Sequence, residues 1–178
     1  PMRDCPNRCV YCDQRAITGH GSSPGPADVE DALRGISEPT EVCFFGGSFT
    51  CQPLDRQEEY LEAVLSAPAP VSVRISTHPL CITPEVLTFL SRFPVKIIEL
   101  GVTSLEDDVL KACNRGYTGA AVLEKISLVT AHPGFIPGVQ LMTGLPGQDP
   151  PSSLEDLGRL AGVKGAGPMQ IRIYPCLV

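Results

Sequence analysis

Short apolar runs alternate with segments of helical periodicity along this chain, and this alternation constrains its fold more than any other feature of the sequence. The predicted strands cover residues 41–45, 71–76, 95–100, 138–142 and 169–174, and the predicted helices cover residues 55–66, 84–94, 104–112, 118–131 and 152–161. Strands that are each followed by a helix predict an α/β fold, a parallel sheet with helices outside. Ligands bind at the carboxyl ends of such strands.

Capping residues predict where the helices begin. Asp55 and Thr83 precede segments of helical spacing, and Ser153 with Asp156 has the separation of an N-terminal capping pair. Residues 22–26 are rich in serine, proline and glycine, so we expect them to form a loop.

The composition is that of one globular domain. The chain has 178 residues, of which 43% are hydrophobic and 19% charged, and this excludes a disordered chain. No apolar run approaches the ~18 residues that a membrane-spanning helix needs, so we expect no membrane partner. The net charge of −6 argues against a broad nucleic-acid-binding face, although it is compatible with a local basic groove.

Three cysteines near the start of the chain predict an iron–sulfur site. Cys5, Cys9 and Cys12 have the spacing Cys-x3-Cys-x2-Cys on a short polar loop. Three thiolates can bind three irons of a four-iron cluster and leave the fourth iron open, and an open metal position is typical of a catalytic site. The spacing differs from the ferredoxin patterns, and no second Cys-x2-Cys pair follows that would complete a structural zinc site.

The remaining cysteines are scattered through predicted strands, helices and loops. They are Cys43, Cys51, Cys81, Cys113 and Cys176. This usage is typical of a protein in a reducing cytoplasm, so we expect a cytoplasmic location and small core residues rather than redox groups. Cys51 and Cys176 lie close to predicted strand ends.

The cysteine motif, with Tyr11 before its last cysteine, resembles the signature of the radical S-adenosylmethionine (radical SAM) superfamily. Further motifs follow it along almost the whole chain. They are Asp13–Gly19, Phe44–Thr50, Ile75–Thr77, Ile98–Val102 and Met142–Gly147. This ordered set is similar to the radical SAM domain of the Elongator catalytic subunit and its short bacterial relatives.

The resemblance implies a partial (β/α)6 barrel of the TIM type that binds a [4Fe-4S] cluster and SAM. One electron, from an external donor of the flavodoxin or ferredoxin type, would cleave SAM to a 5′-deoxyadenosyl radical that abstracts hydrogen from a substrate. The Elongator-like group points to modification of the wobble uridine of tRNA. Two alternatives stay open: a non-enzymatic module that holds iron–sulfur or zinc, and an enzyme like the porphyrinogen oxidases.

The family's cysteine loop follows a first strand, but only four residues precede Cys5, and the chain stops soon after the last predicted strand. We therefore expect residues 1–178 to be a radical SAM core domain that is truncated at both ends and lacks the first strand and the final helix.

The resemblance assigns roles to residues at the strand ends. The turn at residues 46–48 would receive the ammonium of SAM through backbone carbonyls and the Ser48 hydroxyl, and Glu99 would accept hydrogen bonds from the ribose. Arg115 would meet the methionine carboxylate or a substrate anion, although a surface arginine is the alternative. The predicted metal ligands are Cys5, Cys9 and Cys12, and the predicted cofactor-binding residues are Tyr11, Gly46, Gly47, Ser48, Ser76, Thr77, Glu99, Arg115, Gly144, Leu145, Arg172 and Tyr174.

Three residues depart from the family pattern. Thr103 replaces a usual glutamine, His78 a usual arginine and Asn114 a frequent glycine. Thr103 and His78 lie close to the expected site. These two departures therefore concern the identity of the substrate and the details of the pocket, and not the chemistry of the cluster. We expect the isolated histidines to be structural.

Overall fold

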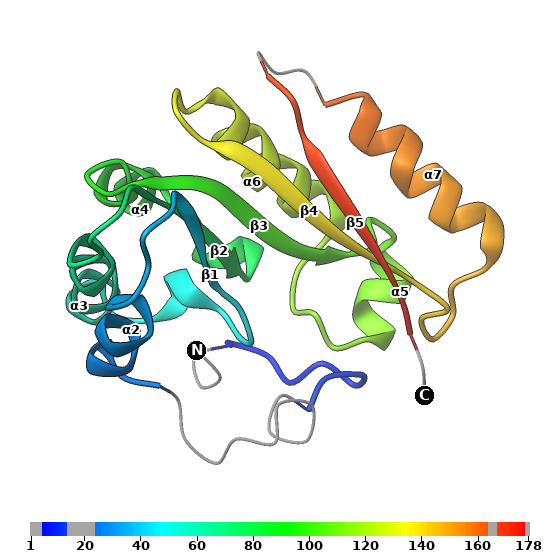
Figure 1. Cartoon of the computed structure of the whole chain (residues 1–178). Helices are drawn as coiled ribbons and strands as arrows, with labels where there is room; N and C mark the ends of the chain where they lie inside the picture. Colours follow the sequence, from blue (N-terminus) through cyan, green and yellow to red (C-terminus); the bar gives the residue numbers. More distant parts are fainter. Residues whose placement is uncertain (1–4, 14–23, 164–166, 177–178) are drawn as a thin grey trace.

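The computed structural model describes residues 5–13, 24–163 and 167–176 of the chain. Its centre is a five-stranded parallel sheet in the order β1-β2-β3-β4-β5, which curls into a half-barrel (Figure 1). The strands are β1 (Thr40–Phe44), β2 (Val71–Thr77), β3 (Val95–Thr103), β4 (Ile136–Thr143) and β5 (Gln170–Pro175). The helices are α2 (Pro26–Leu33), η1 (Phe49–Cys51), α3 (Leu54–Leu65), η2 (Pro79–Cys81), α4 (Pro84–Leu90), α5 (Asp107–Ala112), α6 (Gly119–Ala131) and α7 (Pro150–Ala161). The parallel sheet of a partial TIM-type barrel is thus confirmed.

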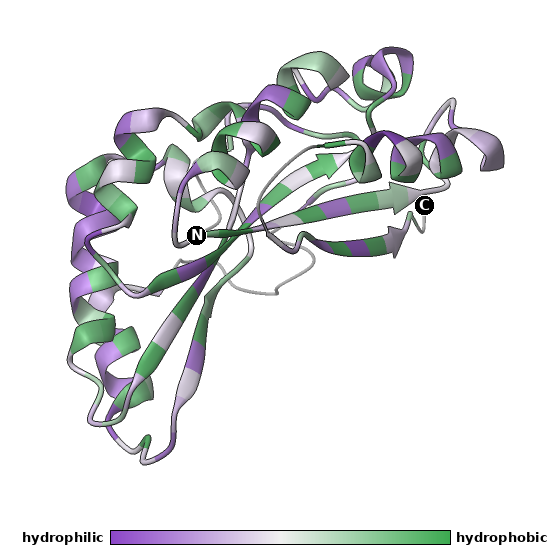
Figure 2. Cartoon of the chain, turned by 90° about the horizontal axis from the view of Figure 1, so that it is seen from above, coloured by the Kyte–Doolittle hydropathy of each residue, from purple (hydrophilic) through white to green (hydrophobic). Residues whose placement is uncertain are grey.

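The hydrophobic core lies between the sheet and its helices. Every second residue of a strand faces the helices, and Ile75, Ile98, Leu100 and Val139 are at most 1% exposed. These side chains share one core cluster with buried residues of α3 and α6. Figure 2 shows the α-helices along one side of the curled sheet. Burial of this apolar layer, at ~25 cal/mol per Å², is what holds the half-barrel together.

The opposite face of the sheet is polar. Glu41, Arg74, Glu99, Gln140 and Arg172 come from five successive strands, and their side chains bond to one another across this face. Because strand residues alternate between the two faces, the same strands supply both the apolar core and this polar interior.

Several helix starts differ from the sequence-based predictions. Thr83 caps α4 as predicted, accepting a hydrogen bond from the Val86 amide at 3.2 Å. Asp55 is not an N-cap, because α3 begins at Leu54 after Pro53. The start of α7 is capped by Asp149, whose carboxylate accepts from the Ser152 amide at 2.9 Å. The predicted pair at residues 153 and 156 is therefore wrong.

A helix was missed at the end of the predicted loop. Residues 24 and 25 are irregular, but Pro26 occupies the first turn of α2, with Gly25 as its N-cap. Proline suits this position because its fixed φ matches the helix and the first amides have no intrahelical acceptor.

Candidate functional site

The cysteine loop lies against the segment that follows α5. The Val10 amide donates to the Cys113 carbonyl at 3.3 Å, and the Asn114 side-chain amide donates to the Arg8 carbonyl at 2.8 Å. Gly116 has a φ of +74°, and a Cβ there would lie 2.4 Å from the side-chain nitrogen of Asn7. A side chain at Gly116 would therefore displace the Asn7 side chain, and only glycine adopts such a backbone at little cost.

The three thiols of this loop differ in exposure. Cys5 is exposed, whereas Cys9 and Cys12 are half-buried. Among the described residues, no group of three His, Cys, Asp or Glu side chains is arranged to hold a single metal ion. A four-iron cluster does not need such a group, because each cysteine binds a different iron. Three thiols on one docked loop therefore have the donor chemistry that an iron–sulfur cluster requires.

Arg115 places a buried positive charge beside this loop. Its Nη1 donates to Cys9 Sγ at 2.9 Å, its Nε donates to the Tyr117 hydroxyl at 2.7 Å, and its Nη2 donates to the Gly101 carbonyl. Arg115 is only 7% exposed, so the surface-arginine alternative is wrong. Arg115 therefore donates a charged hydrogen bond to one of the three predicted metal ligands.

Two tyrosines complete the surroundings of Arg115. Burial raises the pKa of Tyr117 to about 12, so its phenol stays protonated and donates to the Gly101 carbonyl at 2.7 Å. Burial also raises the pKa of Tyr11, whose hydroxyl is buried without a hydrogen-bond partner among the described residues. A buried polar atom without a partner is costly, so a bound group beside Tyr11 would relieve this penalty.

The turn after β1 has the backbone that close approach requires. Gly46 and Gly47 have φ values of +86° and +139°, which favour glycine. Ser48 is completely buried, and its hydroxyl lies 3.0 Å from the Thr77 hydroxyl and accepts from the His78 amide at 2.9 Å. The structure thus brings Ser48 and Thr77 together. The Ser48 hydroxyl therefore bonds within the protein.

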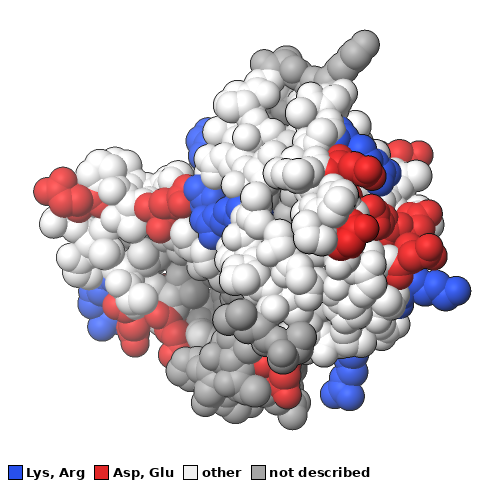
Figure 3. Space-filling view, turned by 90° about the vertical axis from the view of Figure 1, so that its right-hand side faces the viewer, with Lys and Arg blue, Asp and Glu red and all other residues white. Residues whose placement is uncertain are grey.

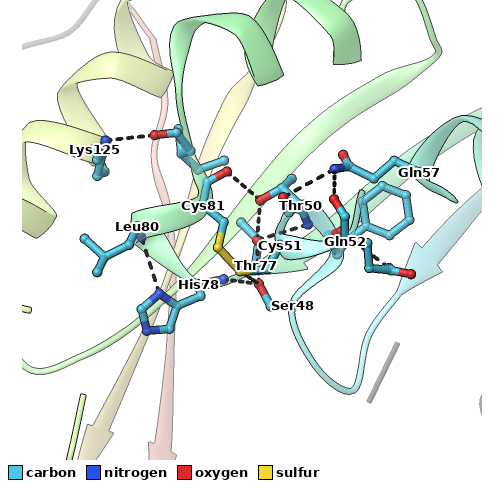
Figure 4. Close-up of a disulfide and its surroundings, with 12 residues drawn as sticks. Ser48, Thr50, Cys51, Gln52, Gln57, Thr77, His78, Leu80, Cys81 and Lys125 are labelled. Carbon is cyan, nitrogen blue, oxygen red and sulfur yellow. Dashed lines mark hydrogen bonds between the residues drawn. A yellow bond between two sulfur atoms is a disulfide. The ribbon is translucent and has the colours of Figure 1, made fainter. Parts of the chain in front are cut away.

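A disulfide joins the connection after β1 to the connection after β2. Cys51, at the end of η1, is bonded to Cys81, at the end of η2, with their Cα atoms 5.1 Å apart (Figure 4). The expectation that these two are small core residues is wrong, because they are bonded to each other and only half-buried. Their separation of 30 residues gave no sequence signal, because only the parallel packing of β1 and β2 brings them together.

Glu99 and Arg74 form the centre of the polar interior. Arg74 Nη1 and Gln140 Nε2 each lie 2.6 Å from the Glu99 carboxylate, and Arg172 Nη2 lies 3.2 Å from it. Glu99 is 1% exposed. A carboxylate has about four acceptor positions, so Glu99 retains capacity for one more donor. Arg74 was missed because an arginine inside an apolar strand gives no sign of its partners.

The remaining predicted residues lie at the ends of β2, β4 and β5. Ser76 Oγ lies 3.4 Å from Gln140 Nε2 on the polar face. Gly144 has a φ of +79°, and Leu145 is buried with Val109 and Cys113 in a small cluster that contacts Tyr11. Tyr174 is 40% exposed, and its hydroxyl lies 3.4 Å from Arg172 Nη1.

Strain and an uncharged histidine also mark this end of the sheet. Thr103 has a φ of +69° at a register shift between β3 and β4. For a β-branched residue this is a strained backbone, of the kind that collects at functional sites. Burial and the nearby Arg115 charge lower the pKa of His78 to about 4, so its ring is neutral at pH 7. The structure thus places the predicted strand motifs at or near the carboxyl ends of the strands, whereas residues 14–19 of the motif after the cysteine loop lie outside the described residues.

A three-cysteine loop docked at the carboxyl end of a parallel half-barrel defines a class of cofactor-dependent enzymes. The sequence matches the radical SAM superfamily over residues 1–160. The chain therefore belongs to the radical SAM superfamily.

Relatives with curated functions include two tRNA-modifying enzymes. The chain is 30% identical over 158 residues to a tRNA-2-methylthio-N(6)-dimethylallyladenosine synthase of Geobacter sulfurreducens, covering 83% of this chain and 35% of the relative. It is 22% identical over 171 residues to a tRNA uridine(34) acetyltransferase of Methanocaldococcus infernus, covering 83% of this chain and 32% of the relative. The chain thus spans about a third of the length of the curated relatives it matches.

Solved structures share the fold at low identity. The archaeal Elp3 of Methanocaldococcus infernus has a TM-score of 0.69 at 21% identity, covering 86% of this chain and 41% of that one. The coproporphyrinogen III oxidase HemN of Escherichia coli has a TM-score of 0.72 at 15% identity, covering 95% of this chain and 41% of that one. The resemblance to the Elongator radical SAM domain is thereby confirmed. Within the described part of the chain, no helix has the length and hydrophobicity to span a membrane.

Proposed function

We propose that Cys5, Cys9 and Cys12 bind a [4Fe-4S] cluster, and that SAM binds beside it against the carboxyl ends of the strands. When bound, the reduced cluster and SAM supply a one-electron cleavage that yields a radical able to abstract hydrogen from a substrate. The observation that carries this proposal is the docked cysteine loop, with the buried Arg115 guanidinium 2.9 Å from Cys9 Sγ.

The chain's own residues would bind and orient these groups. The carbonyls of Gly46 and Gly47 would accept the ammonium of SAM, and the positive φ values of this turn support the close backbone approach that this needs. Glu99 has acceptor capacity left for a ribose hydroxyl, and Tyr11 has a buried hydroxyl that needs a partner. Gly144 and Leu145 would shape the adenine pocket, while Ser76, Thr77, Arg172 and Tyr174 would line the rest of the SAM site.

Metal content tests the cluster directly. After anaerobic reconstitution with iron and sulfide, we expect about four irons and four sulfides per chain, as a [4Fe-4S] cluster requires. Cys9→Ala is expected to lose most of this iron. Cys43→Ala, which removes an exposed cysteine from β1, is the matched control and should retain it. One zinc per chain, or full iron in Cys9→Ala, would overturn the proposal.

We further propose that residues 1–178 act as one radical SAM core domain in the cytoplasm, that a flavodoxin- or ferredoxin-type protein supplies the electron, and that tRNA is the substrate. The two tRNA-modifying relatives support this substrate class. On the face shown in Figure 3, Lys and Arg lie in small separate groups between acidic ones, so on that face tRNA binding would depend on local contacts.

Substrate-dependent turnover separates the candidate substrates. tRNA is expected to increase the formation of 5′-deoxyadenosine from SAM, whereas coproporphyrinogen III is not. Stimulation by the porphyrinogen alone would instead support the oxidase-like alternative, which the fold shared with HemN leaves as a second candidate.

A further inference from the structure

The disulfide Cys51–Cys81 connects two segments that form one wall of the proposed SAM site. Cys51 follows the Gly46–Gly47–Ser48 turn after β1, and Cys81 follows Thr77 and the connection after β2. Figure 4 shows Ser48 and Thr77 beside the sulfur–sulfur bond. The cross-link therefore lies at the same edge of the sheet as the proposed cofactor.

A network of hydrogen bonds continues the cross-link into this wall. Cys51 Sγ lies 2.7 Å from Ser48 Oγ, and Ser48 Oγ lies 3.0 Å from Thr77 Oγ1. Thr50 Oγ1 lies 2.6 Å from Thr77 Oγ1 and donates to the Cys81 carbonyl at 3.0 Å. Movement of either cysteine would therefore be transmitted to the residues that shape the glycine turn.

The two connections are anchored differently outside this network. Lys125 of α6 donates to the Ile82 carbonyl at 2.9 Å, which holds the connection after β2 to its covering helix. In the connection after β1, Gln57 of α3 donates to the Gln52 carbonyl at 2.7 Å. Each connection is thus hydrogen-bonded to a different helix, and the disulfide links the two connections covalently.

The cluster and the disulfide require opposite redox states of cysteine. Cys5, Cys9 and Cys12 bind iron only as thiolates, so the proposed function needs surroundings that keep thiols reduced. Disulfides in such surroundings are usually transient and redox-sensing. Cys51 and Cys81 are each half-buried, so a reductant does not have to unfold the core to approach them.

We infer that Cys51 and Cys81 form a reversible thiol–disulfide switch that sets the affinity of the chain for SAM. A dithiol reductant transfers two electrons and two protons: the sulfur–sulfur bond breaks, two thiols form at Cys51 and Cys81, and the reductant becomes a disulfide. The oxidised form binds SAM more tightly, because a wall that is already held together loses less conformational entropy on binding. The affinity effect rests on the proposed SAM site.

The first measurement follows the cross-link and the motion of the wall without any cofactor. The chain is equilibrated in a series of reduced and oxidised glutathione buffers, free thiols are alkylated, and the peptide that links residues 51 and 81 is quantified by mass spectrometry. We expect the linked peptide to appear and disappear reversibly in the folded protein. Amide hydrogen exchange at residues 46–52 and 77–82 should be faster in the reduced form.

The second measurement determines SAM affinity in iron-loaded protein by equilibrium dialysis with radiolabelled SAM. We expect the reduced form to bind about fivefold or more weakly than the oxidised form, a typical size for coupling between two sites. The double variant Cys51→Ser/Cys81→Ser should bind SAM with the affinity of the reduced form, and its affinity should not depend on the glutathione ratio. Cys43→Ser is the matched control and should respond like the parent chain.

The outcomes distinguish this inference from the proposed function. A cross-link that never forms, or one that is reduced only when the protein unfolds, overturns the inference. Equal SAM affinity in the two forms also overturns it and leaves the SAM site intact. If fully iron-loaded protein binds SAM in neither form, the proposed function fails and the affinity effect fails with it.

Discussion

Arg115 is the residue whose side chain connects the cysteine loop to the sheet. Its three nitrogens reach Cys9 Sγ, the Tyr117 hydroxyl and the Gly101 carbonyl, and its own carbonyl lies 3.3 Å from His78 Nε2. These contacts argue for a positioning residue that orients the loop and presents a positive charge to a cluster ligand. Hydrogen bonds to the ligand sulfurs are among the factors that set the potential of an iron–sulfur cluster.

Replacing Arg115 should therefore change the potential of the cluster. In Arg115→Gln the charged donor to Cys9 is lost, so the reduced, more negative cluster is less stabilised. We expect the reduction potential to fall by something on the order of tens of millivolts, given 1.5–3 kcal/mol for a typical charged hydrogen bond, roughly half of which is recovered by glutamine. A redox titration followed by electron paramagnetic resonance measures it, and the exposed Arg92→Gln is the control. An unchanged or higher potential would contradict this role.

His78 predicts a pH dependence of stability. Its folded-state pKa of about 4 lies below its ordinary value of 6.5, so the unfolded state binds the extra proton between these pH values. The contribution of His78 is complete above about pH 6.5 and is lost as the pH falls toward 4, by at most about 3 kcal/mol.

Urea unfolding at a series of pH values tests this sign. In His78→Gln the free energy of unfolding should depend less steeply on pH between 4 and 6.5 than in the parent chain. His132→Gln, at the end of α6 and away from the site, is the matched control. If His78→Gln retains the full slope, the acid sensitivity arises elsewhere.

At the scale of elements, the polar interior depends on how closely β3 and β4 pack. Gly138 on β4 pairs with Glu99 on β3. A Cβ at Gly138 would lie 2.7 Å from Glu99 Cγ and 3.2 Å from its Cα. Glycine at this position therefore leaves the room beside β4 that the Glu99 side chain occupies.

Gly138→Ala should displace Glu99 and destabilise the chain by about 1–3 kcal/mol, the usual cost of overpacking a filled site. Thermal or urea unfolding measures the loss. Gly35→Ala is the matched control, since a Cβ there meets nothing within 4 Å. Equal stability of the two variants would show that Glu99 can move aside freely.

Helices and strands could be predicted from the sequence where a single local pattern specifies them. Short apolar runs predicted all five strands, and Thr83 predicted the start of α4. The helix α2 was missed because Pro26 resembles a loop residue unless it is placed in a first turn. The cap of α7 was misplaced because Asp149 and Ser153 have similar capping chemistry, and only the observed bond from the Ser152 amide distinguishes them.

Of the candidate site, the sequence predicted the motifs but not the contacts between their side chains. The carboxyl ends of β1, β2, β4 and β5 were identified to within one residue, whereas β3 continues to Thr103, so Glu99 lies inside this strand and not at its end. Partners were not predictable: Arg115 with Cys9, Arg74 with Glu99 and Cys51 with Cys81 are separated by 106, 25 and 30 residues. Such pairs arise from tertiary packing, which leaves no periodic trace in the sequence.

At the scale of the whole molecule, the half-barrel combines an apolar outer layer, a polar interior and one edge where the proposed cofactor groups meet. The chain spans 35% and 32% of the two tRNA-modifying relatives, so substrate choice is a property to be tested on the whole protein. In the proposed function, the cysteine loop and the strand ends would bind the groups that form the radical, and both belong to the described residues.

The most direct test is therefore the reductive cleavage of SAM itself. Iron-loaded protein is incubated anaerobically with dithionite and SAM, and 5′-deoxyadenosine is quantified by chromatography. We predict that the parent chain and Cys43→Ala form 5′-deoxyadenosine, whereas Cys9→Ala forms none above background. If a chain that carries a full cluster and binds SAM forms no 5′-deoxyadenosine, the proposed radical chemistry is contradicted.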